Sequence, residues 1–441
     1  MRKKNKEIEM KKRVLILVIL IIPFASGLKA QKVLTLKECY DLAMVATPIA
    51  AEREAYSQIS AVKDKNLSKG WLPTLDAGGS FIHNSSVVDM TDVLGVIPIP
   101  GIADLIQPLP HEQYKLTVDI NQVIYDGGAI KGARALEKAD FNINEKQTET
   151  DLYKLRGQIN GYYFNLLLLD RQKELLQSYH ELITKRIASM NSALANGVVL
   201  RSDIDVLASE KIKLEQQISE NEIRKGSLIK ILSSLTGTAI DASTQFVLPS
   251  PGEELSGDLL RPELQIFDLR KEQLNAGLQI IQSKRMPKAA GFATLGYGNP
   301  PGSNFFRDEF APYYLLGASI KWNIFDWNKG KNEKQLISLQ QNIIDSRKSE
   351  LTENLKRLLD AKSAEIFNLK SLLESDDELI ALRKRITAAA ESQYENGTIN
   401  ATDYMNEMNA ERLALINYEI HKINLALARI EYMNISGKEI E

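Results

Sequence analysis

Two short stretches of the chain share one framework: NGVVLRSDI at residues 196–204 and NGTINATDY at residues 396–404. Their offset is 200 residues (396 minus 196). Asn-Gly is typical of the end of a helix, and Ser-Asp or Thr-Asp of the start of the next one. Each copy lies between two long segments with helical periodicity. We therefore predict that each copy is the tip of a long helical hairpin.

The same offset relates much of the chain beyond the tips. Identical residues recur without a gap at Tyr114/Tyr314, Leu116/Leu316, Ile120/Ile320, Ile124/Ile324, Asp126/Asp326, Lys131/Lys331, Leu155/Leu355, Gly197/Gly397, Asp203/Asp403 and Gly237/Gly437. Upstream, Pro48/Pro262 and Pro73/Pro287 lie 214 apart (262 minus 48, 287 minus 73). The difference (214 minus 200) predicts fourteen extra residues in the first strand loop, because loops tolerate insertions that packed helices do not.

Long helices follow from the proline-free segments that precede each tip. Residues 128–195 contain no proline, and their apolar residues recur every three or four positions. Such a helix would extend about 100 Å. A second one is expected over residues 327–395. The returning helices, 204–236 and 404–437, are about half as long as the helices that precede the tips. Helices over residues 35–71 and 262–286 are therefore expected to cover the remaining length, between the returning helices and the strands.

Strands are predicted between the start of each long helix and the proline that precedes it, Pro73 in the first repeat and Pro287 in the second. The segment 114–121 alternates strictly, with apolar residues on one face and polar residues on the other. Four such strands in an exported chain suggest a transmembrane β-barrel share with an outward apolar face. Four strands cannot close a barrel, so several chains must contribute. The inward face, with Lys115, Asp119, Asn121 and Lys321, is mixed in charge. The alternative is a soluble, half-exposed sheet.

Aromatic residues gather at both ends of the predicted strands. Trp71, Tyr125, Phe325 and Trp327 lie at the strand–helix junctions, and Phe305, Phe306, Phe310 and Tyr313 at the other end. Two aromatic girdles at the membrane interfaces would have this distribution. Ordinary packing at the ends of elements is the alternative.

The N-terminus has the composition of a secretory signal peptide. Basic residues up to Arg13 precede an apolar run over residues 14–24, which is too short to span a bilayer, and small residues follow. We expect cleavage near Ala30-Gln31. The single cysteine, Cys39, lacks the context of a lipidation site, and we expect a small buried side chain without a lipid anchor.

Composition argues against nucleic-acid binding and against catalysis. The formal net charge is −2, with 25% charged residues dispersed along the helices. The four histidines, His83, His111, His180 and His421, share no metal-ligand spacing, and the sequence has no phosphate-binding glycine loop or nucleophile motif. We therefore predict that the chain is not an enzyme and has no cofactor or metal, although enzymatic chemistry stays a second hypothesis.

Taken together, these segments predict a mainly α chain with a small β part, arranged as two repeats. The signal peptide covers residues 1–30. The first repeat covers 31–237, with a β-hairpin at 74–125 and its tip at 196–203. An irregular equatorial segment covers 238–261. The second repeat covers 262–441, with a β-hairpin at 288–325 and its tip at 396–403.

The ordered set of motifs resembles the TolC-type outer-membrane efflux factor family over essentially the whole mature chain. The motifs are Leu34-Thr35-Leu36-x-Glu38, Arg261-Pro262-Glu263-Leu264, the proline before each hairpin, the aromatic-Asp after it, and the doubled tips. The resemblance implies a homotrimer in the outer membrane with a twelve-stranded barrel and a twelve-helix periplasmic tunnel. It also implies a periplasmic adaptor (membrane fusion) protein and an inner-membrane pump of the RND or ABC class. The chain would be a passive exit duct for efflux or type I secretion. A non-conducting envelope coiled-coil scaffold is the alternative.

In that family the tips meet the adaptor, which points to Gly197, Ser202, Asp203, Gly397, Thr402 and Asp403. The family also narrows its tunnel mouth with acidic residues after the second tip. Asp403 matches the first of these, but Asn406 stands where a second acid is expected, so the aperture should be less acidic unless Glu407 turns inward. A helix N-cap is the alternative role for Asp203 and Asp403.

Overall fold

The computed structural model describes residues 33–87, 110–195, 199–252, 257–304 and 307–439. The predicted signal peptide, Gly197, Phe305 and Phe306 lie outside these ranges. The chain divides into two compact units: one contains residues 51–151 and 261–354, and the other contains the remainder. Each unit takes part of both sequence repeats. None of the helices within the described ranges has the length and apolar character needed to cross a bilayer.

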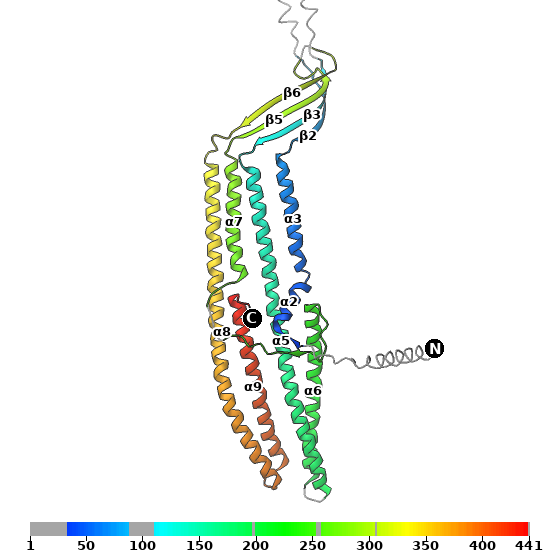
Figure 1. Cartoon of the computed structure of the whole chain (residues 1–441), viewed down its shortest axis with the longest axis vertical. Coiled ribbons are helices and arrows are strands. Elements are labelled where there is room, and N and C mark those ends of the chain that lie inside the picture. The colour runs from blue at the N-terminus through cyan, green and yellow to red at the C-terminus, as the bar shows by residue number, and fades with distance from the viewer. Residues whose placement is uncertain (1–32, 88–109, 196–198, 253–256, 305–306, 440–441) are drawn as a thin grey trace, which may run out of the picture. The chain divides into compact units, whose positions relative to one another are not determined.

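Four helical segments run alongside one another in the unit that holds the sheet (Figure 1). They are α3 (Ala50–Ser68), the first part of α5 (Ala129–Ala195), α7 (Pro262–Ser283) and the first part of α8 (Lys329–Glu395). Ion pairs join α3 to α5, as between Arg134 and Asp64 at 2.6 Å. Others join α7 to α8, as between Lys271 and Asp345 at 2.8 Å. These pairs are exposed, so they fix alignment more than they add stability.

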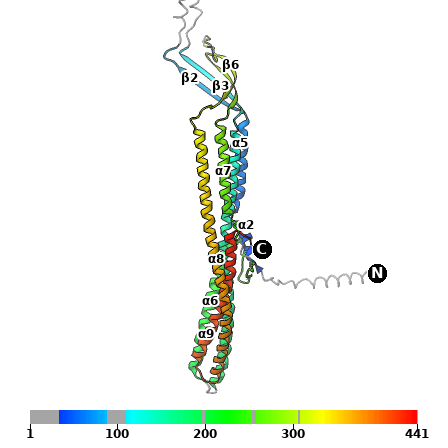
Figure 2. The same cartoon turned by 90° about the vertical axis from the view of Figure 1, so that its left-hand side faces the viewer.

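The same unit contains one antiparallel sheet with strand order β2-β3-β5-β6. Its strands are β2 (Thr74–His83), β3 (Glu112–Tyr125), β5 (Lys288–Asn299) and β6 (Ala311–Lys321). The two hairpins join through β3 and β5, where Leu116 pairs with Tyr297 and Val118 with Leu295. The four predicted strands are confirmed, and the sheet leaves β2 and β6 as open edges (Figures 1 and 2).

One face of the sheet is apolar across all four strands. The pairing register places on this face Leu75, Ala77, Phe81, Tyr114, Leu116, Val118, Ile120, Ala293, Leu295, Tyr297, Tyr314, Leu316, Ala318 and Ile320. In β3 the apolar residues Tyr114, Leu116 and Val118 are exposed, whereas the polar residues between them are partly buried. This inverts the pattern of a soluble sheet, in which the apolar face packs on a core.

On the opposite face of the sheet, glycines on one strand leave space for aromatic rings on the neighbouring strand. A side chain on Gly296 would overlap the ring of Tyr313, and one on Gly317 would overlap the ring of Phe292. Asp119 lies on this face and accepts hydrogen bonds from the hydroxyls of Thr117 and Thr294. The polar face is therefore internally hydrogen-bonded.

The turn from each hairpin into its long helix is capped by an aspartate. Asp126 accepts the backbone N–H groups of Gly128, at 2.8 Å, and Ile130, as the sequence predicts. Asp326 accepts that of Gly330 at 3.0 Å. The second long helix begins at Lys329, and our expected start at Trp327 was wrong, because Trp327 and Asn328 have positive φ (52° and 62°).

The core of the other unit lies around the short helix α2 (Leu36–Ala46). The predicted capping box is present: Thr35 and Glu38 exchange backbone-to-side-chain hydrogen bonds of 2.8 and 3.2 Å. Cys39 is fully buried, as predicted, and burial raises the pKa of its thiol to about 12.

A tyrosine hydroxyl joins the N-terminal segment to the equatorial segment in this core. Strand β1 (Val33–Leu34) pairs in parallel with β4 (Gln245–Phe246). The hydroxyl of Tyr163, on α5, lies 2.9 Å from the carbonyl oxygen of Leu34 and 2.7 Å from that of Val247, and accepts the N–H of Val247. One buried side chain thus holds together three distant parts of the sequence.

The returning helices are α6 (Arg201–Thr236) and α9 (Ala401–Ser436). Each ends at a glycine with positive φ, Gly237 (63°) and Gly437 (89°), the usual left-handed helix end. A second apolar cluster packs α5, α6, α8 and α9 together near the tips through Tyr179, Ile204, Leu207, Ala390 and Tyr404. The helical hairpins of the prediction are therefore confirmed.

Candidate functional site

The second tip is a complete helix-ending turn. Gly397 has φ of 70°, its N–H donates to the carbonyl of Tyr394, and that of Thr398 donates to the carbonyl of Gln393. This pair of bonds is the Schellman motif, which requires a left-handed residue and therefore favours glycine. Gly397 thus ends α8 in the way that the Asn-Gly pair predicts.

The start of α9 shows that Asp403 is not the helix N-cap, which was the alternative role predicted for it. The N-cap is Asn400, whose side chain accepts the N–H of Asp403 at 2.9 Å. Asp403 is the third residue of the helix, and its side chain is exposed. The N-cap interpretation of Asp403 is therefore wrong, and its carboxylate stands free in the first helical turn, where a negative charge suits the helix dipole.

The first tip has a different chemistry. Leu200 occupies the N-cap position without a side-chain hydrogen bond, and it is exposed. Asp203 is also the third helical residue and not the N-cap, but its carboxylate accepts the N–H of Leu200 at 3.2 Å. Ser202 is exposed beside it. The first tip therefore exposes an apolar side chain where the second has a capping amide.

The residues predicted for the aperture lie in the first two turns of α9. Thr402, Asp403 and Asn406 are all exposed, and the two aperture residues, Asp403 and Asn406, lie three positions apart on one side of the helix. Glu407 contacts Arg383 of α8 at 3.3 Å. Its charge is thus partnered within the chain, which leaves Asp403 as the more available acid.

A cluster that the sequence analysis missed joins the hairpins near the tips. The guanidinium of Arg186, on α5, lies 2.8 Å from Glu395 and 3.0 Å from Glu391 of α8. It also lies 5.9 and 5.4 Å from the ring centres of Tyr394 and Tyr404, which stack on each other. Cation–π contacts of this kind strengthen when the group is shielded from water.

The electrostatics of this cluster follow from its burial. Burial opposes the charge on Arg186, but Glu395, Tyr404 and Glu391 outweigh it and raise the Arg186 pKa. Burial also raises the pKa of both tyrosine hydroxyls, Tyr394 and Tyr404. The sequence signal was a departure from the repeat, because Tyr394 and Tyr404 stand opposite Leu194 and Ile204 at the offset of 200.

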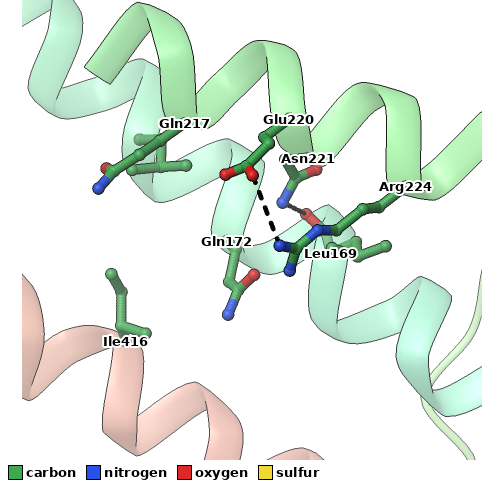
Figure 3. Close-up of a pocket in the computed structure, with 8 residues that line it drawn as sticks. Leu169, Gln172, Gln217, Glu220, Asn221, Arg224 and Ile416 are labelled. Atoms are coloured by element: carbon green, nitrogen blue, oxygen red, sulfur yellow. Dashed lines mark hydrogen bonds and ion pairs between the residues drawn. The ribbon is translucent and has the colours of Figure 1, made fainter. Parts of the chain in front are cut away.

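A pocket of about 210 Å³ lies between α5, α6 and α9. Figure 3 shows the amides of Gln172, Gln217 and Asn221 and the Glu220–Arg224 pair around it. Asn221 is buried and donates to the carbonyl of Leu169 at 3.1 Å. The lining thus consists of amides, one ion pair and apolar side chains from three helices. Within the described residues, no group of three or more His, Cys, Asp or Glu side chains could hold a metal ion.

The two helical-hairpin repeats with one open four-stranded sheet are a fold that the chain shares with solved outer-membrane channels. The family model of outer membrane efflux proteins matches residues 49–220, within the first repeat. This match and the fold agree with the family that the sequence resembles.

Solved structures share the fold over most of the chain. They include the outer membrane protein VceC of Vibrio cholerae (13% identity, 92% of this chain and 97% of that one, TM-score 0.65). The MtrE outer membrane channel of Neisseria gonorrhoeae (14%, 92% and 89%, 0.64) and the CmeC outer membrane channel of Campylobacter jejuni (15%, 91% and 85%, 0.63) are similar. No curated protein matches the sequence.

Proposed function

We propose that the chain is the outer-membrane exit duct of a tripartite efflux or type I secretion system. Three copies would form one channel and conduct substrates passively from a periplasmic adaptor and an inner-membrane pump of the RND or ABC class. The chain would lie in the outer membrane with a long periplasmic extension. The similarity of the fold to the CmeC and MtrE outer membrane channels supports this proposal.

The observation that carries the proposal is the exposed apolar face of the sheet. Tyr314, Leu316 and Ile320 are among the most exposed large apolar side chains of the described residues, and their neighbours on β3 and β5 continue the same surface. A contiguous apolar surface of this size needs lipid or protein against it. The open edges β2 and β6 also need strand partners, which neighbouring copies would supply.

The tips are the proposed docking surface for the adaptor. Gly197, Ser202 and Asp203 would form one contact, and Gly397, Thr402 and Asp403 the other. The exposed Leu200 beside Arg201 adds an apolar and a basic side chain to the first contact, whereas the second has the neutral Asn400 at the position of Leu200. An adaptor would therefore meet two unlike tips in each copy.

The mouth of the duct is the second proposed site. Asp403 from symmetric copies would bring like charges together and favour hydrated cations or basic groups of a partner. Because Asn406 is neutral and Glu407 is paired with Arg383, this mouth would be less acidic than one with two free acids per copy.

Planar-bilayer recording separates the duct from a non-conducting scaffold. Purified oligomer should give discrete conductance steps, and Asp403→Asn should lower its preference for cations over anions. The matched control is Glu407→Gln, which should change selectivity less because that charge is partnered. Absence of any channel at all voltages would overturn the proposal.

Docking is tested separately at the second tip. Gly397→Phe should abolish transport while oligomer and membrane insertion persist, since a bulky residue both strains the turn and blocks the contact. Gly397→Asn is the control, because asparagine tolerates the left-handed conformation. Unchanged transport in Gly397→Phe would remove the docking proposal and leave the channel proposal intact.

A further inference from the structure

The ends of strands β2 and β3 bring together two of the four histidines in the chain. His83 is the last residue of β2, and His111 directly precedes β3, 28 positions further along (111 minus 83). Their ring centres lie 6.4 Å apart, with 31° between the ring planes, and both side chains are exposed. Spacing along the sequence does not predict this pair, because the hairpin and not a local motif forms it.

The ring of His111 is held in one orientation and one tautomer. Its Nδ1 lies 2.7 Å from the carbonyl oxygen of Asn84, and the backbone N–H of Asn84 donates to the carbonyl of His111 at 2.8 Å. Because a carbonyl oxygen can only accept, Nδ1 carries the proton of the neutral ring, and the lone pair is on Nε2. Histidines that bind metal ions in proteins almost always donate their other ring N–H in this way. The Nε2 atom of His111 is therefore available as a metal ligand.

The pairing register places a carboxylate beside His83. Glu112 lies directly opposite His83, and both are exposed. Two residues further into the sheet, the rings of Phe81 and Tyr114 pack with their centres 4.9 Å apart, which aligns the strand ends. The hydroxyl of Tyr114 donates to Glu112 at 3.4 Å, a long bond that a rotation of the Glu112 side chain would break at little cost. Glu112 thus adds a negative charge and an oxygen donor close to the two imidazoles.

The second hairpin has no such pair. The offsets of 214 and 200 give Tyr297 as the counterpart of His83 and Ala311 as the counterpart of His111, and Pro312 stands opposite Tyr297 where Glu112 stands opposite His83. The two hairpins otherwise share their pairing register. The potential metal ligands are therefore specific to the first hairpin and are not a requirement of the strand pairing.

We propose that His83 and His111 together bind a divalent transition-metal ion. Imidazole nitrogen suits Cu²⁺, Zn²⁺ and Ni²⁺, whereas Mg²⁺ and Ca²⁺ prefer oxygen ligands. A metal–nitrogen bond of about 2.0–2.1 Å places two bound ring centres about 5–6 Å apart, so a small rotation of the exposed ring of His83 suffices. Water or the carboxylate of Glu112 would complete the coordination.

This site differs from a resident metal centre. Two histidines fall short of the three or more ligands that no group within the described ranges provides. The ion would therefore exchange with the solution, and it would stabilise the paired ends of β2 and β3 by binding only to the folded hairpin. One hairpin of one chain forms the site, so the proposal does not rest on the proposed channel function.

Copper binding to the purified protein, free of any affinity tag, tests the site. Wild-type protein should bind one Cu²⁺ per chain and give an electron paramagnetic resonance spectrum with two imidazole nitrogens as ligands. His83→Gln and His111→Gln should each weaken binding about tenfold or more, since loss of even an orienting partner of a ligand costs about 10- to 100-fold. Excess Zn²⁺ or Ni²⁺ should displace the copper, and Mg²⁺ or Ca²⁺ should not.

The other two histidines provide the matched controls. His180 pairs with Glu215 at 3.1 Å and His421 with Asp376 at 2.6 Å, both on the long helices and away from the sheet. His180→Gln and His421→Gln should therefore leave copper binding unchanged. Heat-modifiable gel mobility checks that each variant is folded.

Three results would overturn the proposal. They are copper binding by wild-type protein no tighter than by the double variant of His83→Gln with His111→Gln, an equal loss in the control variants, or a spectrum with only one nitrogen ligand. Conductance decides the proposed function separately. A conducting channel that binds no copper overturns only this site, and a copper-binding protein that does not conduct overturns only the channel.

Discussion

The carboxylate of Glu210 on α6 lies 3.3 Å from the guanidinium of Arg412 on α9, and both side chains are largely buried. This ion pair joins the two repeats near the tips. A second cation, Lys213, lies 3.4 Å from the other oxygen of Glu210. Arg412 therefore depends on Glu210 more than Glu210 depends on Arg412.

The two single substitutions should differ in cost. Glu210→Ala should lower the free energy of unfolding by about 3–5 kcal/mol, the usual cost of leaving a buried charge unpaired. Arg412→Ala should cost less, because Lys213 still neutralises Glu210. Denaturant unfolding followed by circular dichroism measures both. The double variant Glu210→Leu with Arg412→Met is the control and should recover most of the loss; equal costs for both single variants would contradict the asymmetry.

A charge introduced at one of two adjacent residues on β6 should impair membrane insertion, whereas the same charge at the other should not. Leu316 lies on the apolar face and Leu315 on the other. Leu316→Arg should cost about 2–4 kcal/mol of insertion energy at the bilayer midplane, and so reduce the amount of protein in the outer membrane. Leu315→Arg, the matched control, should insert normally. Fractionation and heat-modifiable gel mobility measure this, and equal insertion of both variants would argue against a lipid-facing surface.

The features that could be predicted from sequence depend on residues close together in the chain. The caps of Thr35 with Glu38 and of Asp126 join groups within four residues, so local rules suffice. Strand alternation and the 200-residue offset are likewise visible without packing. The start of α8 was misplaced because positive φ at Trp327, a residue without special preference for it, has no local signal.

The features that were missed depend on pairs far apart in sequence. Arg186 meets Glu395 across 209 residues, and no local pattern marks either one. The capping amide of Asn400 has no counterpart in the first copy, where Leu200 stands, so the residues that the two copies share, Asp203 and Asp403, do not predict it. These side chains lie at positions where the two copies differ, since Arg186, Glu395 and Asn400 stand opposite Ile386, Ala195 and Leu200 at the offset of 200.

Alkaline pH should destabilise the core around α2 through Cys39. Burial, with the nearby carboxylate of Glu38, raises the thiol pKa to about 12, from about 9 when exposed. Below pH 9 the thiol is protonated in both states and stability is unaffected. Above it the unfolded thiol loses its proton while the folded one keeps it, so stability falls by about 1.4 kcal/mol per pH unit.

Substitution separates this thiol from its neighbour Tyr40, whose pKa burial also raises to about 12, from 10. Cys39→Ala should remove the slope between about pH 9 and 10. Tyr40→Phe should leave that slope and reduce the one above pH 10. Unfolding free energies across this range provide the measurement, and a Cys39→Ala protein with an unchanged slope would contradict the assignment.

Exchanging the residues Leu200 and Asn400 between the tips should exchange the tips' stabilities. Leu200→Asn would give the N–H of Asp203 a side-chain acceptor, and with the existing bond from Leu200 N–H to Asp203 it completes a reciprocal cap. Asn400→Leu removes the bond of 2.9 Å to Asp403. Each change should shift local stability by about 1 kcal/mol, in opposite directions. Amide hydrogen exchange in the first turns of α6 and α9 measures this, as slower exchange in the first variant and about fivefold faster exchange in the second. Equal protection in both variants would mean that the apolar cluster behind Ile204 and Tyr404, and not the cap, fixes these turns.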